Sequence, residues 1–242
     1  MTVVTDLRGP LAGKFRFCSN HSAFTLIELL SVLVIIAIIS ALAFTSIPLM
    51  LKANQIDSSA AVVTGILDLA HEAAISSNTY VWVAFTDPSA NSSFHGIWVA
   101  TILSQDGTES PINTGTASAP IWATSITIPG NNLQLLNKIQ SLPGVSIVDA
   151  TALPSALTSQ APASATALFE GSVTWTVTPL QNSTSSTIYF THAIEFAPNG
   201  NAHVPTWNSN IQFGLVPIQG STTNAILFNV SRFTGKATSY RR

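Results

Sequence analysis

Charged side chains are scarce in this sequence. Asp, Glu, Lys and Arg make up 8% of the 242 residues, whereas soluble globular proteins carry about a quarter. Cysteine is rarer still, since Cys18 is the only one in the chain. No disulfide can therefore form within the chain. A cell-envelope location remains compatible with the composition, provided that packing supplies the stability.

The short motifs of common enzyme classes are also missing. The sequence has no GxGxxG or P-loop motif and no GxSxG motif, and His71-Glu72 is not followed by a second histidine at zinc-protease spacing. The five histidines are isolated, and Asp106 and Glu109 flank a turn without the dense carboxylates of a calcium loop. We therefore expect a non-enzymatic protein with no catalytic residue, no metal site and no cofactor.

Short apolar runs separated by Gly, Pro, Ser, Thr and Asn fill most of the chain, and this favours β-strands and turns over a helical bundle. We predict strands at residues 80–85, 94–103, 172–178, 188–196, 210–216 and 225–233. Residues 108–166 are predicted as an insertion with partial structure and short apolar pieces at 121–128 and 145–148. Within it, the Ala/Ser/Thr/Pro-rich stretch 150–167 is expected to form a flexible surface loop.

One long apolar run stands near the N-terminus. Residues 29–51 are 23 positions without a charge, long enough to cross the ~30 Å hydrocarbon core of a bilayer as a helix. Arg8, Lys14 and Arg16 precede this run. The positive-inside rule therefore places residues 1–23 in the cytoplasm and the bulk of the chain outside.

The pattern becomes amphipathic beyond Pro48, where a kink is expected. Apolar residues recur at alternating steps of four and three and form one stripe: Ile56, Ala60, Val63, Leu67, Ala70 and Ala74. Asn78 ends the pattern, so we predict a single helix over 25–77. The expected fold class is α+β, with a long N-terminal helix, membrane-spanning in its first half, packed on an antiparallel β-sheet domain.

Three interpretations of the N-terminal run are open. An ordinary signal peptide would be cut after Ser40-Ala41-Leu42-Ala43, before Phe44. A plain membrane anchor would remain uncut. Neither accounts for Glu28, because a carboxylate within an apolar helix is costly and is usually functional.

The third interpretation is a resemblance. Residues 23–30, Ala-Phe-Thr-Leu-Ile-Glu-Leu-Leu, resemble the prepilin cleavage and methylation motif of type IV pilin-like proteins. The resemblance implies that a prepilin peptidase cuts between Ala23 and Phe24 and methylates the new amine of Phe24. It also implies that Glu28 pairs with such an amine on a neighbouring subunit during assembly. The family usually has glycine where this chain has Ala23, and we expect processing to survive the change.

Three further segments resemble the H-type minor pseudopilins of type II secretion and the related FimT pilins. They are 69–78, 195–200 (Glu-Phe-Ala-Pro-Asn-Gly) and 226–236, which ends in Thr-Gly-Lys. The resemblance implies a structural subunit of a type II secretion pseudopilus or a type IV pilus-like filament. Its partners would be the prepilin peptidase, other pilin or pseudopilin subunits, an inner-membrane assembly platform and membrane lipid. The implied organisation is a leader (1–23), a helix (24–78, transmembrane at about 29–51) and a β-rich domain (79–242).

The expected location is the bacterial inner membrane, in a single pass with a cytoplasmic N-terminus and a periplasmic C-terminal domain, and then the filament. One alternative is a type IV pilus minor pilin that contacts DNA. FimT-like pilins include DNA-uptake proteins with a basic C-terminal motif, and Lys236, Arg241 and Arg242 would then contact phosphates. The other alternative is a secreted β protein with an ordinary signal peptide.

Overall fold

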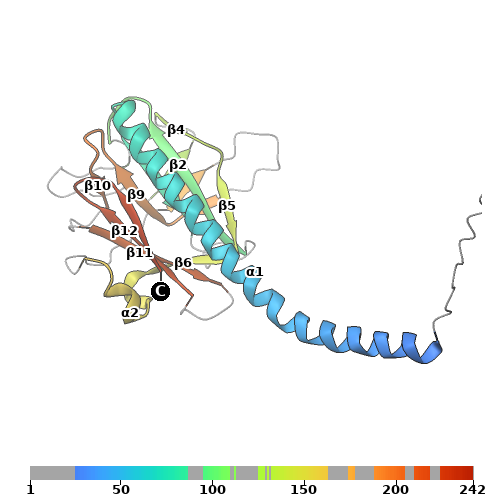
Figure 1. Ribbon diagram of the computed structural model, residues 1–242. Coiled ribbons are helices and arrows are strands. Elements are labelled where there is room, and N and C mark those ends of the chain that lie inside the picture. The colour runs from blue at the N-terminus through green and yellow to red at the C-terminus, as the bar shows by residue number, and fades with distance from the viewer. Residues whose placement is uncertain are drawn as a thin grey trace, which may run out of the picture. The chain divides into compact units, whose positions relative to one another are not determined.

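The computed structural model describes residues 25–86, 95–109, 112, 125–128, 130, 132–162, 174–177, 188–204, 210–218 and 224–241, without the side chains of 42–53, 125, 174, 175 and 177. The chain forms two compact units, Met1–Ile47 and Pro48–Arg242. Helix α1 (Leu26–Ser76) belongs to both units (Figure 1). This range confirms the helix predicted over 25–77 to within one residue at each end. The helix continues through Pro48, and the kink expected there stays a prediction.

Helix α1 ends at the asparagine that the sequence pattern indicated. Asn78 has a φ of 50°, a left-handed conformation that asparagine tolerates better than most residues. The Thr79 N–H donates to the Ala74 carbonyl oxygen at 3.1 Å, and the Asn78 N–H donates to that of Ile75 at 3.3 Å. These two bonds are the pair that defines a Schellman motif, so the last carbonyls of the helix are satisfied without a further turn.

The first sheet is antiparallel and contains six strands. They are β10 (Ala202–His203), β9 (His192–Phe196), β1 (Val81–Phe85), β2 (Gly96–Ser104), β4 (Leu133–Leu135) and β5 (Gln140–Pro143). Strands β4 and β5 both pair with β2, because β2 is long enough to hold one at each end.

A second, four-stranded antiparallel sheet and a three-stranded sheet complete the domain. The second sheet has the order β13 (Ala237–Arg241), β12 (Ile226–Ser231), β11 (Asn210–Pro217) and β6 (Val145–Asp149). The third has the order β3 (Ser125–Ile128), β7 (Thr174–Val177) and β8 (Ile188–Phe190). Strand β3 runs parallel to β7, so the α+β class is confirmed and the sheets are mostly, not wholly, antiparallel.

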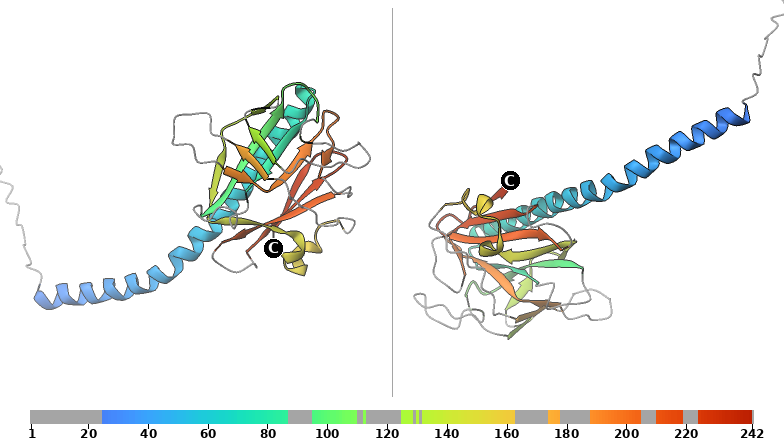
Figure 2. Two further views of the ribbon diagram at one scale, coloured as in Figure 1. Left: turned by 180° about the vertical axis from the view of Figure 1, so that it is seen from behind. Right: turned by 90° about the horizontal axis from the view of Figure 1, so that it is seen from below.

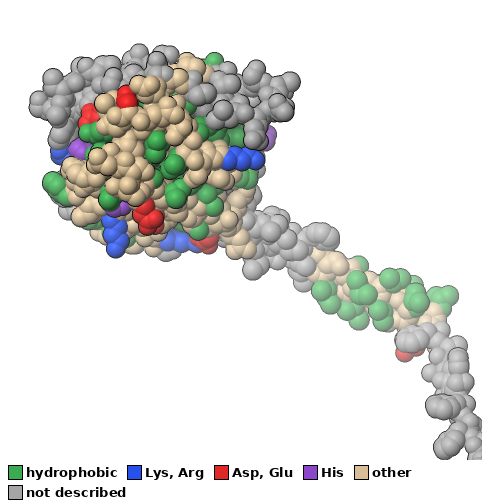
Figure 3. Space-filling model, turned by 90° about the horizontal axis from the view of Figure 1, so that it is seen from above, with side chains coloured by type: hydrophobic (Ala, Val, Ile, Leu, Met, Phe, Trp, Pro, Cys, Tyr) green, Lys and Arg blue, Asp and Glu red, His purple; other side chains and the backbone are tan. Residues whose placement is uncertain are grey.

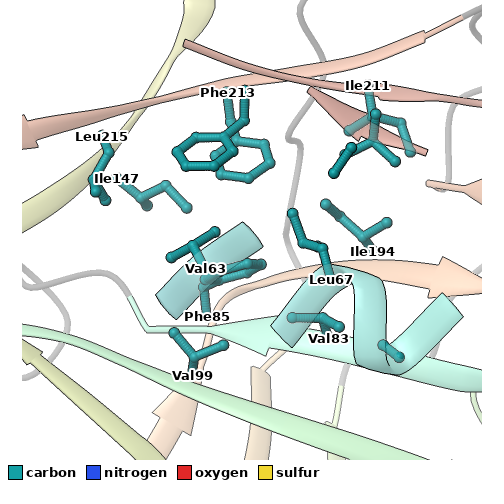
Figure 4. Packing of buried hydrophobic residues seen from close by; sticks show 14 of the residues in the cluster. Val63, Leu67, Val83, Phe85, Val99, Ile147, Ile194, Ile211, Phe213 and Leu215 are labelled. Atoms are coloured by element: carbon teal, nitrogen blue, oxygen red, sulfur yellow. The ribbon is translucent and has the colours of Figure 1, made fainter. Parts of the chain in front are cut away.

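The second half of α1 packs against the first and second sheets. All six residues of the predicted apolar stripe are buried, which confirms the amphipathic pattern. Figure 4 shows Val63 and Leu67 of the helix in the same cluster as Phe213 of the second sheet and Phe85 of the first. The rings of Phe213 and Phe85 are in contact, with centroids 5.7 Å apart. Phe213 also stacks on Phe228, with ring centroids 5.0 Å apart. Burying a side chain of this size stabilises a fold by about 1.5–3 kcal/mol, so this cluster is the main core.

The outer faces of both large sheets are covered as well. On the first sheet, Trp82 and Ile102 belong to a cluster with residues of the third sheet. On the second sheet, η1 (Ala150–Ala152) and α2 (Ser155–Thr158) lie over the strands (Figure 2), and Leu153 and Leu157 belong to one buried cluster with Leu227. Each large sheet is therefore buried on two sides, and its strands are accordingly apolar at consecutive positions.

The prediction of a flexible surface loop at 150–167 was wrong over its described part, 150–162. Leu153 and Leu157 are buried there, with 7% and 2% of their surface exposed. The Asp149 carboxylate caps η1 by accepting a hydrogen bond from the Thr151 N–H at 2.8 Å. The composition is low in large apolar residues, but two well-placed leucines suffice because α2 needs to cover only a small patch of sheet. Residues 163–167 lie outside the described part of the chain.

The predicted strands are confirmed, except that one predicted strand is two strands in the structure. The run predicted at 188–196 becomes β8 and β9, which join different sheets on either side of Thr191. Described residues 125–162 of the predicted insertion supply strands to all three sheets. Their contribution to the architecture is therefore larger than the sequence indicated.

Candidate functional site

The expected processing site lies beside the start of the described chain. Ala23 and Phe24 are outside the described residues, which begin at Thr25. Helix α1 starts one residue later, at Leu26. A cut before Phe24 would therefore leave the new amine two residues before the first helical residue, Leu26.

Glu28 lies in the first turn of α1 and is exposed. Its backbone N–H donates to the Thr25 hydroxyl oxygen at 3.3 Å, and its carbonyl oxygen accepts from the Ser31 hydroxyl at 2.8 Å. Thr25 is thus the N-cap and Glu28 the third helical residue, the spacing of a capping box. This role of Thr25 was not predicted, although Thr-x-x-Glu before an apolar run is a recognised signal of a helix start. A carboxylate also suits the positive end of the helix dipole.

Apolar side chains surround the described helix of the unit Met1–Ile47. They include Leu26, which is 82% exposed, and Ile39, which is 61% exposed. The exposed apolar residues follow one another with few interruptions over 26–39, so they occupy every side of the helix. Figure 3 shows this stretch covered by hydrophobic side chains. In the part of the chain that the structure describes, no helix has the length and apolarity needed to cross a membrane.

The basic residues near the C-terminus do not share one environment. Arg241 Nη1 forms an ion pair with the Asp57 carboxylate of α1, and Arg241 Nη2 donates to the Asn224 side-chain oxygen at 3.0 Å. Lys236 is exposed, and its backbone N–H donates to the Thr234 hydroxyl at 3.4 Å. Arg242 lies outside the described residues. The guanidinium of Arg241 is therefore already neutralised in part by an acid of its own chain.

The three segments that carry the H-type resemblance meet at His71. The His71 ring packs edge-on against Phe196 with centroids 5.9 Å apart, and its Nε2 lies 3.2 Å from the Gly200 carbonyl oxygen. A Cβ at Gly235 would lie 2.7 Å from His71 Nε2, so the absence of a side chain there allows the close approach. Segments 69–78, 195–200 and 226–236 thus form one contact region.

A buried acid lies on the outer face of the first sheet. Glu195 on β9 is 3% exposed, and its Oε2 accepts a hydrogen bond from the Trp82 indole N–H at 2.9 Å. Burial raises the pKa of Glu195 to about 8, the nearby charge of Glu109 adds to the rise, and the Trp82 hydrogen bond opposes it. In the sequence, Glu195 stands between the apolar residues Ile194 and Phe196. That signal of a buried acid was available, but only the resemblance made use of this segment.

Two more titratable groups lie beside Glu195. Burial raises the pKa of Tyr80 to about 12, and Glu109, which also accepts a hydrogen bond from the Tyr80 hydroxyl, raises it further. Burial lowers the pKa of His203, as does the charge of Arg232. Glu195 and the groups that act on it or lie beside it come from five parts of the fold, so only the tertiary structure assembles them: Tyr80, Glu109, His203 and Arg232.

Asp106, which was considered as a calcium ligand, is occupied by donors of its own chain. Its carboxylate accepts from the Ser104 hydroxyl at 2.8 Å, the Thr108 N–H at 3.0 Å and the Asn132 amide at 2.8 Å. These hydrogen bonds, that of Ser104 first, lower the pKa of Asp106 below its usual range. Among the described residues no group of three or more His, Cys, Asp or Glu is arranged to hold a metal ion.

Comparison with known proteins identifies the N-terminal segment. The model of the prokaryotic N-terminal methylation motif matches residues 18–44. This motif is the prepilin signal of type IV pilin-like proteins, and it implies processing by a prepilin peptidase and assembly with other pilin subunits. No curated protein and no solved structure matches the chain. The resemblance to H-type pseudopilins and FimT pilins stays a prediction.

Proposed function

We propose that the chain is a minor pilin or pseudopilin that enters a filament through α1. A prepilin peptidase cuts it between Ala23 and Phe24 and methylates the new amine. Before assembly, residues 29–51 anchor it in the bacterial inner membrane, with the leader in the cytoplasm and the β domain in the periplasm. The role is structural and uses no catalytic residue, metal or cofactor. An inner-membrane assembly platform and neighbouring subunits are the partners.

The observation that carries this proposal is the methylation motif at 18–44, which overlaps the start of an exposed apolar helix. A helix that is apolar all round must be covered by lipid or by other protein. Residues 26–39 have this character in the unit Met1–Ile47. Lipid would cover the whole apolar surface of this helix before assembly. Neighbouring helices would cover it in the filament.

Glu28 has two roles to separate, the helix start and the proposed pairing with the Phe24 amine of a neighbour. Glu28→Gln is the informative variant, because glutamine can replace glutamate in a capping box but carries no charge. Thr25→Ala is the matched control, since it removes the cap and keeps the charge. We expect Glu28→Gln to be cut normally and to be depleted from filaments at least tenfold, whereas Thr25→Ala is incorporated. Normal incorporation of Glu28→Gln would contradict a pairing role.

The first test of the whole proposal is the mature N-terminus, measured by mass spectrometry after co-expression with a prepilin peptidase. We expect a start at Phe24 with one added methyl group. A start at Phe44 would identify an ordinary signal peptide, and an uncut chain would identify a plain anchor. Ala23→Gly is the control, because it restores the residue that the family usually has at this position and should be cut at least as fast.

The H-type pseudopilin version of the proposal is supported by the contact region around His71, where the three resembling segments meet. It can be tested by placing the gene product in a type II secretion system from which the native minor pseudopilin has been removed. Restored secretion would support this version. Incorporation into a type IV pilus without restored secretion would support the pilus version.

A further inference from the structure

Glu195 lies in a row of side chains that crosses the outer face of the first sheet. It is opposite Trp82 of β1 on one side and opposite His203 of β10 on the other. The flanking residues Ile194 and Phe196 point the other way, into the core around α1. Because side chains alternate along a strand, Glu195 faces the cluster that contains Trp82 and the third sheet.

This position buries the carboxyl group, since Glu195 is 3% exposed. The Trp82 indole N–H donates a hydrogen bond to its Oε2. Ile112 is fully buried in the Trp82 cluster, and its N–H donates to the Glu109 carbonyl oxygen at 2.9 Å. This hydrogen bond joins Glu109 to the buried Ile112, and the charge of Glu109 acts on Glu195.

The titratable groups that face this region come from each element packed around it. Tyr80 precedes β1, Glu109 follows β2, His203 is on β10, and Arg232 follows β12 and acts on His203. The charge that acts on Glu195 is therefore that of another acid, Glu109. A buried carboxyl group beside a second carboxylate is more stable with its proton bound than ionised. Release of the proton would place two like charges against an apolar cluster.

We infer that Glu195 is a proton-binding site that couples pH to the packing of the outer face of the first sheet. With the proton bound, Glu195 and Trp82 close the apolar cluster around Ile112. With the proton lost, the charge on Glu195 loosens that cluster, while the α1 core on the other face is unaffected. The outer face of the first sheet is thus more rigid in acidic and neutral medium than in alkaline medium, and this inference does not depend on the proposed function.

The Trp82 indole N–H reports directly on this site. The full chain, purified in mild detergent and labelled with ¹⁵N-tryptophan, should give five indole signals, one for each tryptophan. Trp82→Phe assigns the signal of interest by its loss. We expect that signal to titrate with a midpoint above pH 7, and to stay constant in Glu195→Gln. Glu109→Gln, which removes the second acid and leaves Glu195 in place, should shift the midpoint to lower pH.

Hydrogen exchange of the same indole tests the coupling to packing. At pH 9 we expect exchange at least tenfold faster in the wild type than in Glu195→Gln, and equal rates at pH 6. A Trp82 signal that titrates below pH 6, or does not move between pH 5 and 9.5, would overturn the proton site. If the wild type and Glu195→Gln exchanged at the same rate at pH 9 as well as at pH 6, the coupling would be overturned. Should Glu195→Gln fold poorly, the shift caused by Glu109→Gln decides the question alone.

Discussion

The Nε2 atom of His71 lies 3.2 Å from the carbonyl oxygen of Gly200, and this contact joins the last turns of α1 to the turn after β9. Gly200 has a φ of 83° and Gly235 a φ of 62°. Residues other than glycine rarely adopt these backbone angles. A Cβ at Gly235 would also lie 2.6 Å from the Gly200 carbonyl oxygen. Two turns and one helix can therefore meet at His71 only because both turns have glycine there.

Gly235→Ala should lower the free energy of unfolding by about 2–4 kcal/mol, because it adds a left-handed alanine and a clash with backbone. Chemical denaturation monitored by circular dichroism measures this. The matched control is Gly65→Ala in α1, where a Cβ would meet nothing within 4 Å. That variant should gain about 0.5–1 kcal/mol from helix propensity. Equal effects of the two substitutions would contradict the contact at His71.

Glu195→Gln should flatten the pH dependence of stability. The pKa of Glu195 is raised from 4.5 to about 8 on folding, so its protonated form contributes stability that is complete below about pH 4.5 and is lost as pH rises through about 8. Glutamine cannot titrate, so the wild type should lose on the order of 1 kcal/mol or more relative to the variant between pH 5 and 8.5. Urea unfolding at several pH values gives the slopes. Glu72→Gln, exposed on α1, is the control and should leave the wild-type slope unchanged.

Gly214→Ala should destabilise the second sheet by about 1–3 kcal/mol, since a Cβ there would lie 2.7 Å from Cδ2 of Leu153. Leu153→Ala should cost about 2–4 kcal/mol by leaving a cavity. The double variant should cost less than the sum of the two by about 1 kcal/mol, because the new methyl group occupies part of that cavity. Additive free energies would show that Leu153 does not lie over Gly214. Leu69→Ala, on the exposed face of α1, is the control, with an expected effect within about 0.5 kcal/mol.

Arg241→Ala should have a small effect on stability, about 0.5 kcal/mol, because the side chains of Arg241 and Asp57 are 39% and 48% exposed. A double-mutant cycle with Asp57→Ala should give a coupling energy of similar size that declines with added salt. Asp57→Asn frees the guanidinium without altering its position in β13. If Arg241 contacts DNA, salt-sensitive binding should increase in Asp57→Asn and disappear in Arg241→Ala/Arg242→Ala. Binding that is the same in all these variants would exclude a role for Arg241 in DNA contact.

The elements that the sequence predicted well are those whose burial follows a simple period. The stripe from Ile56 to Ala74 repeats at helical spacing, and all six of its members are buried. Asn78 ended the helix as expected. The methylation motif was also recognisable from residues 23–30 alone, because processing acts on a contiguous segment of chain. In each case the information lies within a few neighbouring residues.

Which segments cover the outer faces of the sheets was much harder to predict from the sequence. Leu153 and Leu157 stand in a stretch of small and polar residues, and their burial depends on the face of β11 and β12 that they happen to cover. Strand β3 pairs with β7 in parallel over a gap of some forty-five residues, and no local pattern specifies such a partner. Thr191 divides one apolar run between two sheets, because β8 and β9 find their partners in different parts of the chain.

The sequence by itself determined the processing motif, the helix that ends before Asn78 and most of the longer strands, because each depends on residues adjacent in the chain. The short strands β4, β5 and β10 were not predicted. Tertiary structure alone decided which of its few charges are buried, paired or exposed. Glu195 faces Glu109 and Trp82, Arg241 pairs with Asp57, and His71 contacts Gly200. The partners in each pair are far apart in sequence, and the free energy of a charge depends on the groups that folding brings around it.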